Sequence, residues 1–327
     1  MKCWTVFACA ALLAAAGARA ENVWTLGAYR PKAGWPLTSP DGSVTVLLDG
    51  GAKEDFASAS VRLAKCIETN APGGCVIDMR GMSVRRGETV TAVKDVSIGK
   101  QFLCGDGRVS AFFADKVSSV GVRAFHSSGA LDIRIECLPT LVRFPDGMAN
   151  NAGAAGVFTK CANLTNIEIR AAGLVSIGNA NVANLPALRR IAIDAPRLES
   201  LGASRATFTA LTALETVELN TPALREVGES WPPFNASHRL REVVWRSDPP
   251  SLGIVKRVLN GVAPVSNVAE AGKKCVLRVP AGNEAWKALA SEYEGREAEF
   301  APPGCLGVVF ASSRKAWMVE EGVEGAD

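Results

Sequence analysis

The stretch FTKCANLTNIEIR, residues 158–170, decides the fold because its spacing recurs along the centre of the chain. Phe158 is followed six residues later by Leu164, and then by Ile167 and Ile169 in alternation. Such alternation predicts a short strand with one buried face. The same pattern recurs in five blocks that begin at Phe125, Phe158, Val182, Phe208 and Phe234. The six-residue step leads in turn to Leu131, Leu164, Leu188, Leu214 and Leu240.

These leucines are separated by 33, 24, 26 and 26 residues. The spacings fall in the range of leucine-rich repeats once the first is shortened by its loop, residues 145–156, which is rich in Gly, Ala and Asn. A single unit of this kind cannot bury its apolar residues, whereas stacked units share one core. The sequence therefore predicts a repeat solenoid. We expect a leucine-rich-repeat-like array of short parallel strands, with an irregular or helical convex side, capped at both ends.

A glycine closes three of the blocks at the same offset from the leucine: Gly178, Gly202 and Gly228. Glycine adopts positive φ without a steric penalty. We expect each of these glycines to have positive φ, in the turn that leads to the next coil.

The central block also resembles a known family. Residues 158–170, followed by LVSIG at 174–178, are similar to the BspA-type leucine-rich repeat of bacterial surface and secreted proteins. The segment VGVRAF at 120–125 is similar to that family's link between repeats. The resemblance extends from Val120 to about Trp245. It implies a leucine-rich-repeat fold and a role in surface binding or adhesion, with ligands that vary among members.

The start of the chain has the pattern of a secretory signal peptide. Residues 1–20 contain an early Lys2, an apolar run over 6–16 and a small-x-small ending at Ala20. The apolar run is shorter than the roughly 20 residues that a membrane-spanning helix needs. We therefore expect a secreted protein, located extracellularly, in a periplasm or at a cell surface, with no membrane span.

The remaining chain divides into four parts. Residues 21–115 are expected to form an N-terminal cap and degenerate repeats, with a helix over 54–69 and a strand over 76–79. Residues 116–250 form the leucine-rich-repeat array. Residues 251–300 form a C-terminal capping unit, with a strand over 275–280 and a helix over 284–293 that Asn283 caps. Residues 301–327 form a hairpin and an acidic tail.

The nine cysteines become seven once residues 1–20 are removed, and an exported chain meets an oxidising environment. Cys66 and Cys75 flank a Pro-Gly-Gly turn that could bring them together, while Cys275 and Cys305 bracket one C-terminal unit. Each pair is either a disulfide or a set of buried thiols that pack as small apolar side chains. The spacing does not decide between the two.

The net charge and the missing motifs argue against nucleic-acid binding and against catalysis. The 36 basic and 33 acidic residues give a net charge of +3, which is too even for an electrostatic nucleic-acid binder. The sequence lacks a Gly-x-Ser-x-Gly elbow, a GxGxxG fingerprint and a phosphate-binding loop. The two histidines, His126 and His238, have no metal-ligating partner at a suitable spacing. We expect no catalytic residue, cofactor or metal, and thus not an enzyme.

The residues between the buried positions should point to solvent from the stacked strands. They mix both charge signs and include no aromatic residue: Asp132, Arg134, Glu136, Asn166, Glu168, Arg170, Arg190, Ala192, Asp194, Thr216, Glu218, Asn220, Glu242, Val244 and Arg246. This face is either simply solvated or a binding surface for a polar partner. The predicted binding residues are Glu168, Arg170, Arg190, Asp194, Glu218, Asn220, Glu242 and Arg246.

The predicted function is therefore binding of an extracellular protein or a surface glycan through the strand face, and not of nucleic acid. An alternative is a structural envelope component that uses the repeats as a scaffold. The sequence gives no indication of the oligomeric state.

Overall fold

The computed structural model describes residues 22–27, 29–49, 56–80, 96–100, 102–103, 107–150, 153–179, 181–202, 207–228, 233–234, 237, 239–260, 275–291, 305–310 and 315–322. The expected signal peptide over 1–20 lies outside these residues, and so do His238 and all of residues 81–95. Among the described residues, no helix is both long and apolar enough to cross a membrane.

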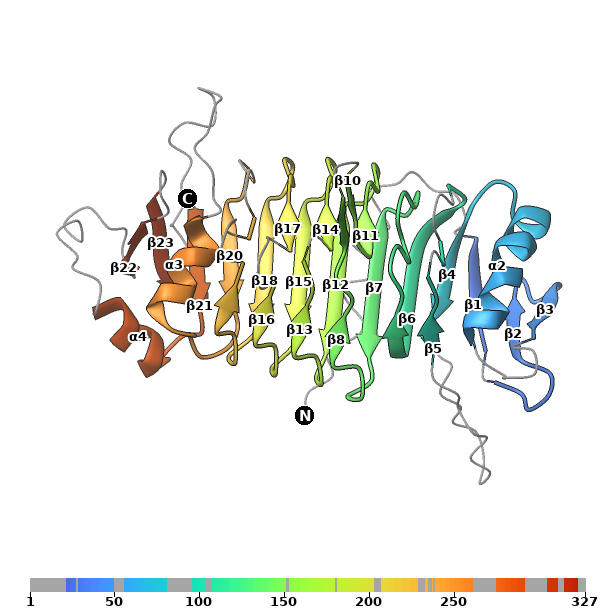
Figure 1. The fold of residues 1–327 in the computed structure, drawn as a ribbon, viewed down its shortest axis with the longest axis horizontal. Helices are drawn as coiled ribbons and strands as arrows, with labels where there is room; N and C mark the ends of the chain where they lie inside the picture. The colour runs from blue at the N-terminus through green and yellow to red at the C-terminus, as the bar shows by residue number, and fades with distance from the viewer. Residues whose placement is uncertain are drawn as a thin grey trace.

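One long sheet dominates the described part of the chain, and its strands follow one another in sequence order apart from a hairpin at each end (Figure 1). Ten of its strands run parallel to their neighbours: β1 (Val23–Leu26), β4 (Cys75–Met79), β6 (Val109–Val120), β7 (Asp132–Cys137), β12 (Asn166–Ala171), β15 (Arg190–Asp194), β18 (Thr216–Asn220), β20 (Glu242–Trp245), β21 (Cys275–Val279) and β23 (Lys315–Glu320). Strand β5 (Val96–Ile98) pairs with β6. The antiparallel strands β2 (Trp35–Thr38) and β3 (Thr45–Leu48) close one end, and β22 (Cys305–Phe310) closes the other. We call this the main sheet.

Two short parallel sheets lie opposite the main sheet. One contains β8 (Arg143–Phe144), β13 (Ser176–Ile177), β16 (Ser200–Leu201) and β19 (Glu226–Val227). The other contains β11 (Phe158–Thr159), β14 (Val182–Ala183) and β17 (Phe208–Thr209). A small hairpin of β9 (Met148–Asn150) and β10 (Gly153–Ala155) forms a further, separate sheet. The chain thus winds through three strands per turn and is solenoid-like. Where the structure describes the central blocks, the side opposite the main sheet is built from short strands and turns, not from helices.

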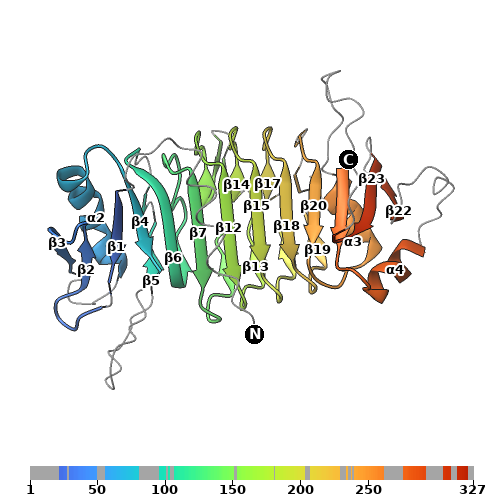
Figure 2. The ribbon, with the colours of Figure 1, turned by 180° about the vertical axis from the view of Figure 1, so that it is seen from behind.

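The helices lie near the two ends of the main sheet, on the same side as the short sheets (Figures 1 and 2). The expected helix over 54–69 is α2 (Phe56–Asn70), and the expected strand after it is β4. The C-terminal helix is α4 (Glu284–Ser291), and the Asn283 side chain caps it by accepting a hydrogen bond from the Trp286 amide at 3.1 Å. The sequence did not predict α3 (Leu252–Asn260).

The predicted rows of apolar residues pack side by side. Parallel pairing aligns one row from Ile133 to Val243 and a second from Ile135 to Trp245. Every member of the two rows is at most 2% exposed. Burial of one such side chain stabilises the fold by about 1.5–3 kcal/mol, so these rows account for much of its stability.

The leucine row differs from the prediction in the first block. Leu164, Leu188, Leu214 and Leu240 are fully buried, whereas Leu131 is 45% exposed. The Leu131 carbonyl accepts hydrogen bonds from the amides of Thr165 and Asn166, just as the Thr165 carbonyl does from the next strand. Leu131 is therefore equivalent to Thr165, and the buried Ala130 occupies the leucine position. The first block is one residue shorter between its phenylalanine and its strand, so the six-residue spacing of Leu131 was misleading.

The expected glycine conformation holds at Gly202, whose φ is 68°, but not at Gly178. A Cβ atom at Gly178 would lie 2.7 Å from the Asp146 Cα atom and from the Pro145 carbonyl oxygen. Gly178 is thus required by the close approach of a neighbouring loop and not by its φ angle.

Of the two interpretations of Cys66 and Cys75, the disulfide is wrong, because Cys66 is a buried free thiol in α2. The Asn70 amide lies 3.7 Å from the Cys66 sulfur, and burial raises the pKa of this thiol above its usual value. Cys66 therefore packs as a small apolar side chain, which was the other interpretation of the sequence. The side chain of Cys305 lies outside the described residues.

Candidate functional site

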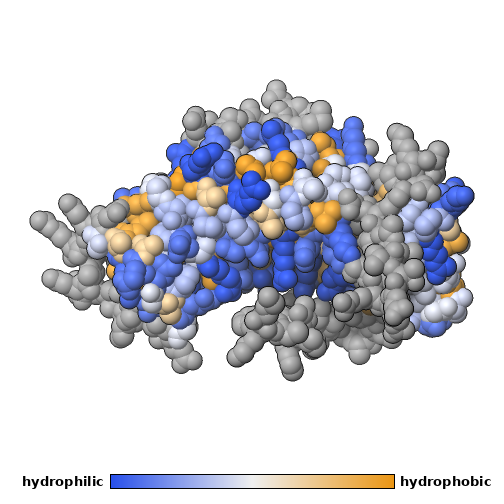
Figure 3. Space-filling model, turned by 90° about the horizontal axis from the view of Figure 1, so that it is seen from below, coloured by the Kyte–Doolittle hydropathy of each residue, from blue (hydrophilic) through white to orange (hydrophobic). Residues whose placement is uncertain are grey.

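The outward side chains of the main sheet form the expected polar face. Strand register places them in rows that cross the sheet. The first row contains Asp132, Asn166, Arg190, Thr216 and Glu242. The second contains Arg134, Glu168, Ala192, Glu218 and Val244. The third contains Glu136, Arg170, Asp194 and Asn220. We call this surface the strand face. Hydrophilic residues also dominate the middle of the surface seen from below, with hydrophobic residues scattered among them (Figure 3).

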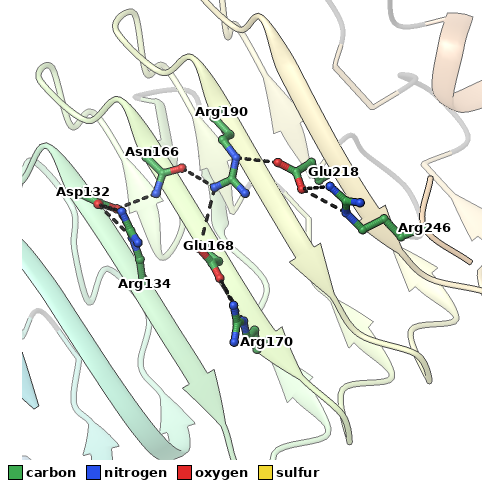
Figure 4. Close-up of polar contacts among 8 residues, drawn as sticks. All are labelled: Asp132, Arg134, Asn166, Glu168, Arg170, Arg190, Glu218 and Arg246. Atoms are coloured by element: carbon green, nitrogen blue, oxygen red, sulfur yellow. Dashed lines mark hydrogen bonds and ion pairs between the residues drawn. The ribbon is translucent and has the colours of Figure 1, made fainter. Parts of the chain in front are cut away.

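Arg190 is the centre of a polar network on the strand face (Figure 4). Its Nε atom donates a hydrogen bond to the Glu218 Oε1 atom at 2.7 Å. Its Nη1 atom donates to the Asn166 Oδ1 atom at 2.9 Å and lies 3.8 Å from a Glu168 oxygen. One guanidinium group on β15 thus holds side chains from the strands on both sides.

The network continues outward from this centre. Asn166 donates a hydrogen bond to the Asp132 carboxylate at 2.6 Å, and Arg134 is paired with the same carboxylate at 2.6 Å. On the other side, Arg246 donates to Glu218 at 3.0 Å. Arg170 pairs with Glu168 at 2.9 Å. Polar contacts therefore run without a break from β7 across β12, β15 and β18 to Arg246, which directly follows β20.

The electrostatics of Glu218 show how the network balances its charges. Burial by itself would raise the pKa of the Glu218 carboxyl group, but hydrogen bonds and charge from Arg190 and then Arg246 outweigh it. The pKa of Glu218 is therefore held below its usual value. The carboxylate stays charged and fixes both guanidinium groups in position.

The eight predicted binding residues all lie on the strand face, but they do not form one cluster. Glu168, Arg170, Arg190, Glu218 and Arg246 belong to the network. Asp194 and Asn220 form a separate contact, with 2.7 Å between the Asn220 amide nitrogen and the carboxylate. Glu242 pairs with Arg278 on β21. The sequence analysis did not include Arg278 or Glu321, which bonds to Arg246.

The expectation of no aromatic residue concerned the outward positions from Asp132 to Arg246, and aromatic residues lie on strands outside that range. Phe113 on β6 pairs with Arg134 and is half-buried. The guanidinium carbon of Arg80 lies 4.7 Å from the centre of the Phe113 ring, and that of Arg134 lies 5.3 Å from it. These are cation–π distances. At the other end, Trp317 on β23 pairs with the outward Val276 and is nearly buried.

Asp115 is a second feature that the sequence analysis missed. It lies at an irregularity where the register of β6 against β7 shifts, beside Lys116, whose φ is 54°. Its Oδ1 atom is buried and has no hydrogen-bond partner. Burial, together with the charges of Glu136 and Asp78, raises the pKa of Asp115 despite the opposing charge of Lys116. No repeat pattern covers this strand, so the sequence offered no signal for it.

The described residues show no metal centre. They include no group of three or more His, Cys, Asp or Glu side chains that could hold a metal ion. The His126 Nδ1 atom lies 2.6 Å from the Thr159 hydroxyl, and burial lowers the pKa of this histidine. His126 thus has a hydroxyl neighbour and not an acidic one, as expected for a structural histidine.

Comparisons with protein-family models, with curated proteins and with solved structures find no match to this chain.

Proposed function

We propose that this chain is a secreted, non-enzymatic leucine-rich-repeat protein that binds an extracellular protein or a surface glycan through the strand face. The BspA-type resemblance of residues 120–245 supports the repeat assignment, and so does the solenoid-like order of the parallel strands. The pattern of residues 1–20 supports secretion. Because the core runs beneath the face, its outward side chains are available to a partner.

The observation that carries this proposal is the polar network centred on Arg190. A flexible charged surface loses side-chain entropy when a partner fixes it, at about 0.5–1.5 kcal/mol for each long side chain. Here Arg190 and Glu218 are already fixed by contacts at 2.7–2.9 Å. The face thus offers donors and acceptors in set positions, which favours recognition of a polar partner.

The test is a pull-down from the medium or the cell surface with charge-reversal variants. Glu168→Lys, Glu218→Lys and Glu242→Lys should each weaken capture of the partner several-fold, because each reverses a charge on the face. Glu199→Lys is the matched control, since Glu199 pairs with Arg225 near the short sheets. Capture that is unchanged in all three face variants, with normal thermal unfolding, would contradict the proposal.

A further inference from the structure

On the strand face, the arginine is the more exposed member of most ion pairs. The side chain of Arg170 is 55% exposed, whereas that of Glu168 is 18% exposed. Arg246 is 46% exposed against 20% for Glu218. The same order holds for Arg190–Glu218 and for Arg80–Asp78, with Arg278–Glu242 as an exception. The carboxylates sit low on the face and the guanidinium groups point outward, so an approaching partner meets N–H donors first.

Arg246 forms hydrogen bonds to two carboxylates, and one of them, Glu321, comes from outside the network centred on Arg190. Its Nε and Nη2 atoms bond to Glu218 on β18, which belongs to the network within the sheet (Figure 4). Its Nη1 atom donates a hydrogen bond at 2.5 Å to Glu321, which comes from the turn after β23. Strand β21 lies between β20 and β23, so the Glu321 side chain reaches across one strand to Arg246.

The turn that carries Glu321 is anchored through its backbone. The Glu321 amide donates a hydrogen bond to the Val279 carbonyl at 2.7 Å, and the Glu320 carboxylate accepts one from the Gly282 amide. The Glu321 side chain is 41% exposed. It can therefore leave Arg246 without disturbing β23. An exposed ion pair of this kind contributes little to stability, so a competing carboxylate can replace it at little cost.

We propose that Arg246 is a carboxylate-binding position of the strand face, and that an acidic segment of a partner protein takes the place of Glu321 there. This inference rests on the proposed function and names the class of partner. Glu321 is itself an acidic side chain on a short peptide turn, and thus shows the chemistry that Arg246 accepts. One carboxylate replaces another, so Arg246 stays paired with an acidic group throughout the exchange.

The surroundings of Arg246 favour an acidic peptide over an acidic polysaccharide. A polyanion needs a stripe of uncompensated positive charge. The neighbouring strands instead present Glu218, Asp194 and Glu242 among the arginines, and these carboxylates would repel the successive charges of a polyanion. A peptide can place a single carboxylate on Arg246 and set neutral residues beside it.

The test measures binding of a fluorescent pentapeptide, Gly-Gly-Glu-Gly-Gly with blocked ends, by anisotropy at low salt. Glu321→Gln should bind this peptide about two- to fivefold more tightly than the unmodified chain, because it removes the internal competitor. Arg246→Gln should lose nearly all binding. Arg225→Gln is the control, since Arg225 also forms an exposed ion pair but lies near the short sheets, and its binding should not change.

Thermal unfolding of each variant separates loss of the site from loss of the fold. Arg246→Lys is a second variant that keeps the positive charge, and it should retain weak binding. Equal affinities for the unmodified chain, Glu321→Gln and Arg246→Gln would overturn the inference. So would tighter binding of an oligogalacturonate with the same dependence on Arg246, since it would point to a glycan.

The same variants separate this inference from the proposed function. Partner capture that needs Glu168 and Glu242 but ignores Glu321→Gln and Arg246→Gln would overturn the inference and leave the proposed function standing. Peptide binding that follows the predicted order, together with partner capture that no face variant weakens, would overturn the proposed function and leave Arg246 as a carboxylate site.

Discussion

At the scale of single residues, Asp115 on β6 has a buried acceptor that lacks a hydrogen-bond donor. This acceptor is its Oδ1 atom, and Asp78 and Glu136 add negative charge nearby, opposed by Lys116 and by a hydrogen bond from the backbone. A buried acceptor without a partner lowers the free energy of unfolding. Asp115 is therefore a local weakness of β6.

This weakness predicts a pH dependence. Because the folded pKa of Asp115 is raised, the folded state binds its proton more tightly than the unfolded state does. Its contribution to stability is therefore greatest below the unfolded pKa and falls as the pH rises through the folded pKa. Asp115→Asn should raise the free energy of unfolding at pH 7 by about 0.5–1 kcal/mol, after allowance for solvent screening. The gain should vanish at acidic pH.

Urea unfolding at a series of pH values checks this prediction. Asp41→Asn is the control, and its effect on stability should depend on pH in the opposite direction. Hydrogen bonds from the Ser39 side chain, and then from the Ser43 amide and side chain, lower the pKa of Asp41 to about 2. Asp41 contributes stability above its unfolded pKa, which is lost as the pH falls. If Asp115→Asn raised the free energy of unfolding equally at every pH, ionisation of Asp115 would not be the cause of the gain.

At the scale of elements, one buried asparagine ties neighbouring coils together. Asn181 precedes β14 and is fully buried. Its amide nitrogen donates hydrogen bonds to the carbonyls of Pro145 and Gly178 at 2.6 and 2.9 Å, and its oxygen accepts one from the Val157 amide at 3.1 Å. These bonds satisfy the backbone of the loop that interrupts the first repeat. The loop can therefore be accommodated without opening the stack.

Replacement of Asn181 should lower the free energy of unfolding. Asn181→Leu keeps the volume but removes the bonds to the Pro145 carbonyl and the Val157 amide, and leaves the Gly178 carbonyl with only a long contact from Thr207. We therefore expect the free energy of unfolding to fall by about 2–4 kcal/mol. Thr207 occupies the same position before β17, and its hydroxyl makes only long contacts of 3.3–3.4 Å. Thr207→Val should therefore cost less than about 1 kcal/mol. Equal costs in chemical denaturation would refute this role of Asn181.

The coils also share a strained turn. Ser127, Lys160, Asn184 and Ala210 each follow the first residue of their block by two positions, and all have φ between 55° and 59°. Left-handed backbone is unfavourable for residues other than glycine and asparagine. Its recurrence at one position shows that the path of the coil, and not the local sequence, sets this conformation.

At the scale of the whole molecule, the fold is a row of units that each contact mainly their neighbours, so the ends decide whether the core stays covered. Helix α4 covers the C-terminal end with Trp286, which is fully buried. Its ring meets that of Trp245 at a centroid distance of 5.8 Å, and its Nε1 atom donates a hydrogen bond to the Ser247 carbonyl.

Removal of this cap should destabilise the strands next to it and leave distant strands protected. Trp286→Ala should lower the free energy of unfolding by about 3–5 kcal/mol, because it opens a cavity over the last coils. Hydrogen exchange should accelerate in β20, β21 and β23 while β7 and β12 keep their protection, since coupling passes between adjacent units. Lys287→Ala in the same helix is the control. Uniform acceleration across all strands would contradict this view of the fold.

The sequence by itself determined the repeated strands. Alternation of apolar residues between Ile133 and Trp245 is a local property, and it fixes which side chains of β7, β12, β15, β18 and β20 are buried whatever the rest of the chain does. It also placed α2, α4 and the C-terminal hairpin of β22 and β23, because their apolar spacing and the Asn283 cap are local too. The eight predicted binding residues lie on the outward face of the main sheet for the same reason.

Only the tertiary structure decided which of those residues meet. The contact of Arg190 with Glu218, the shift that exposes Leu131 and the placement of Phe113 all depend on how strands distant in sequence align. The bond between Arg246 and Glu321 joins residues 75 positions apart. A periodic pattern specifies the face of a side chain. The neighbours of that side chain follow from strand register and from loop length, which the pattern does not contain.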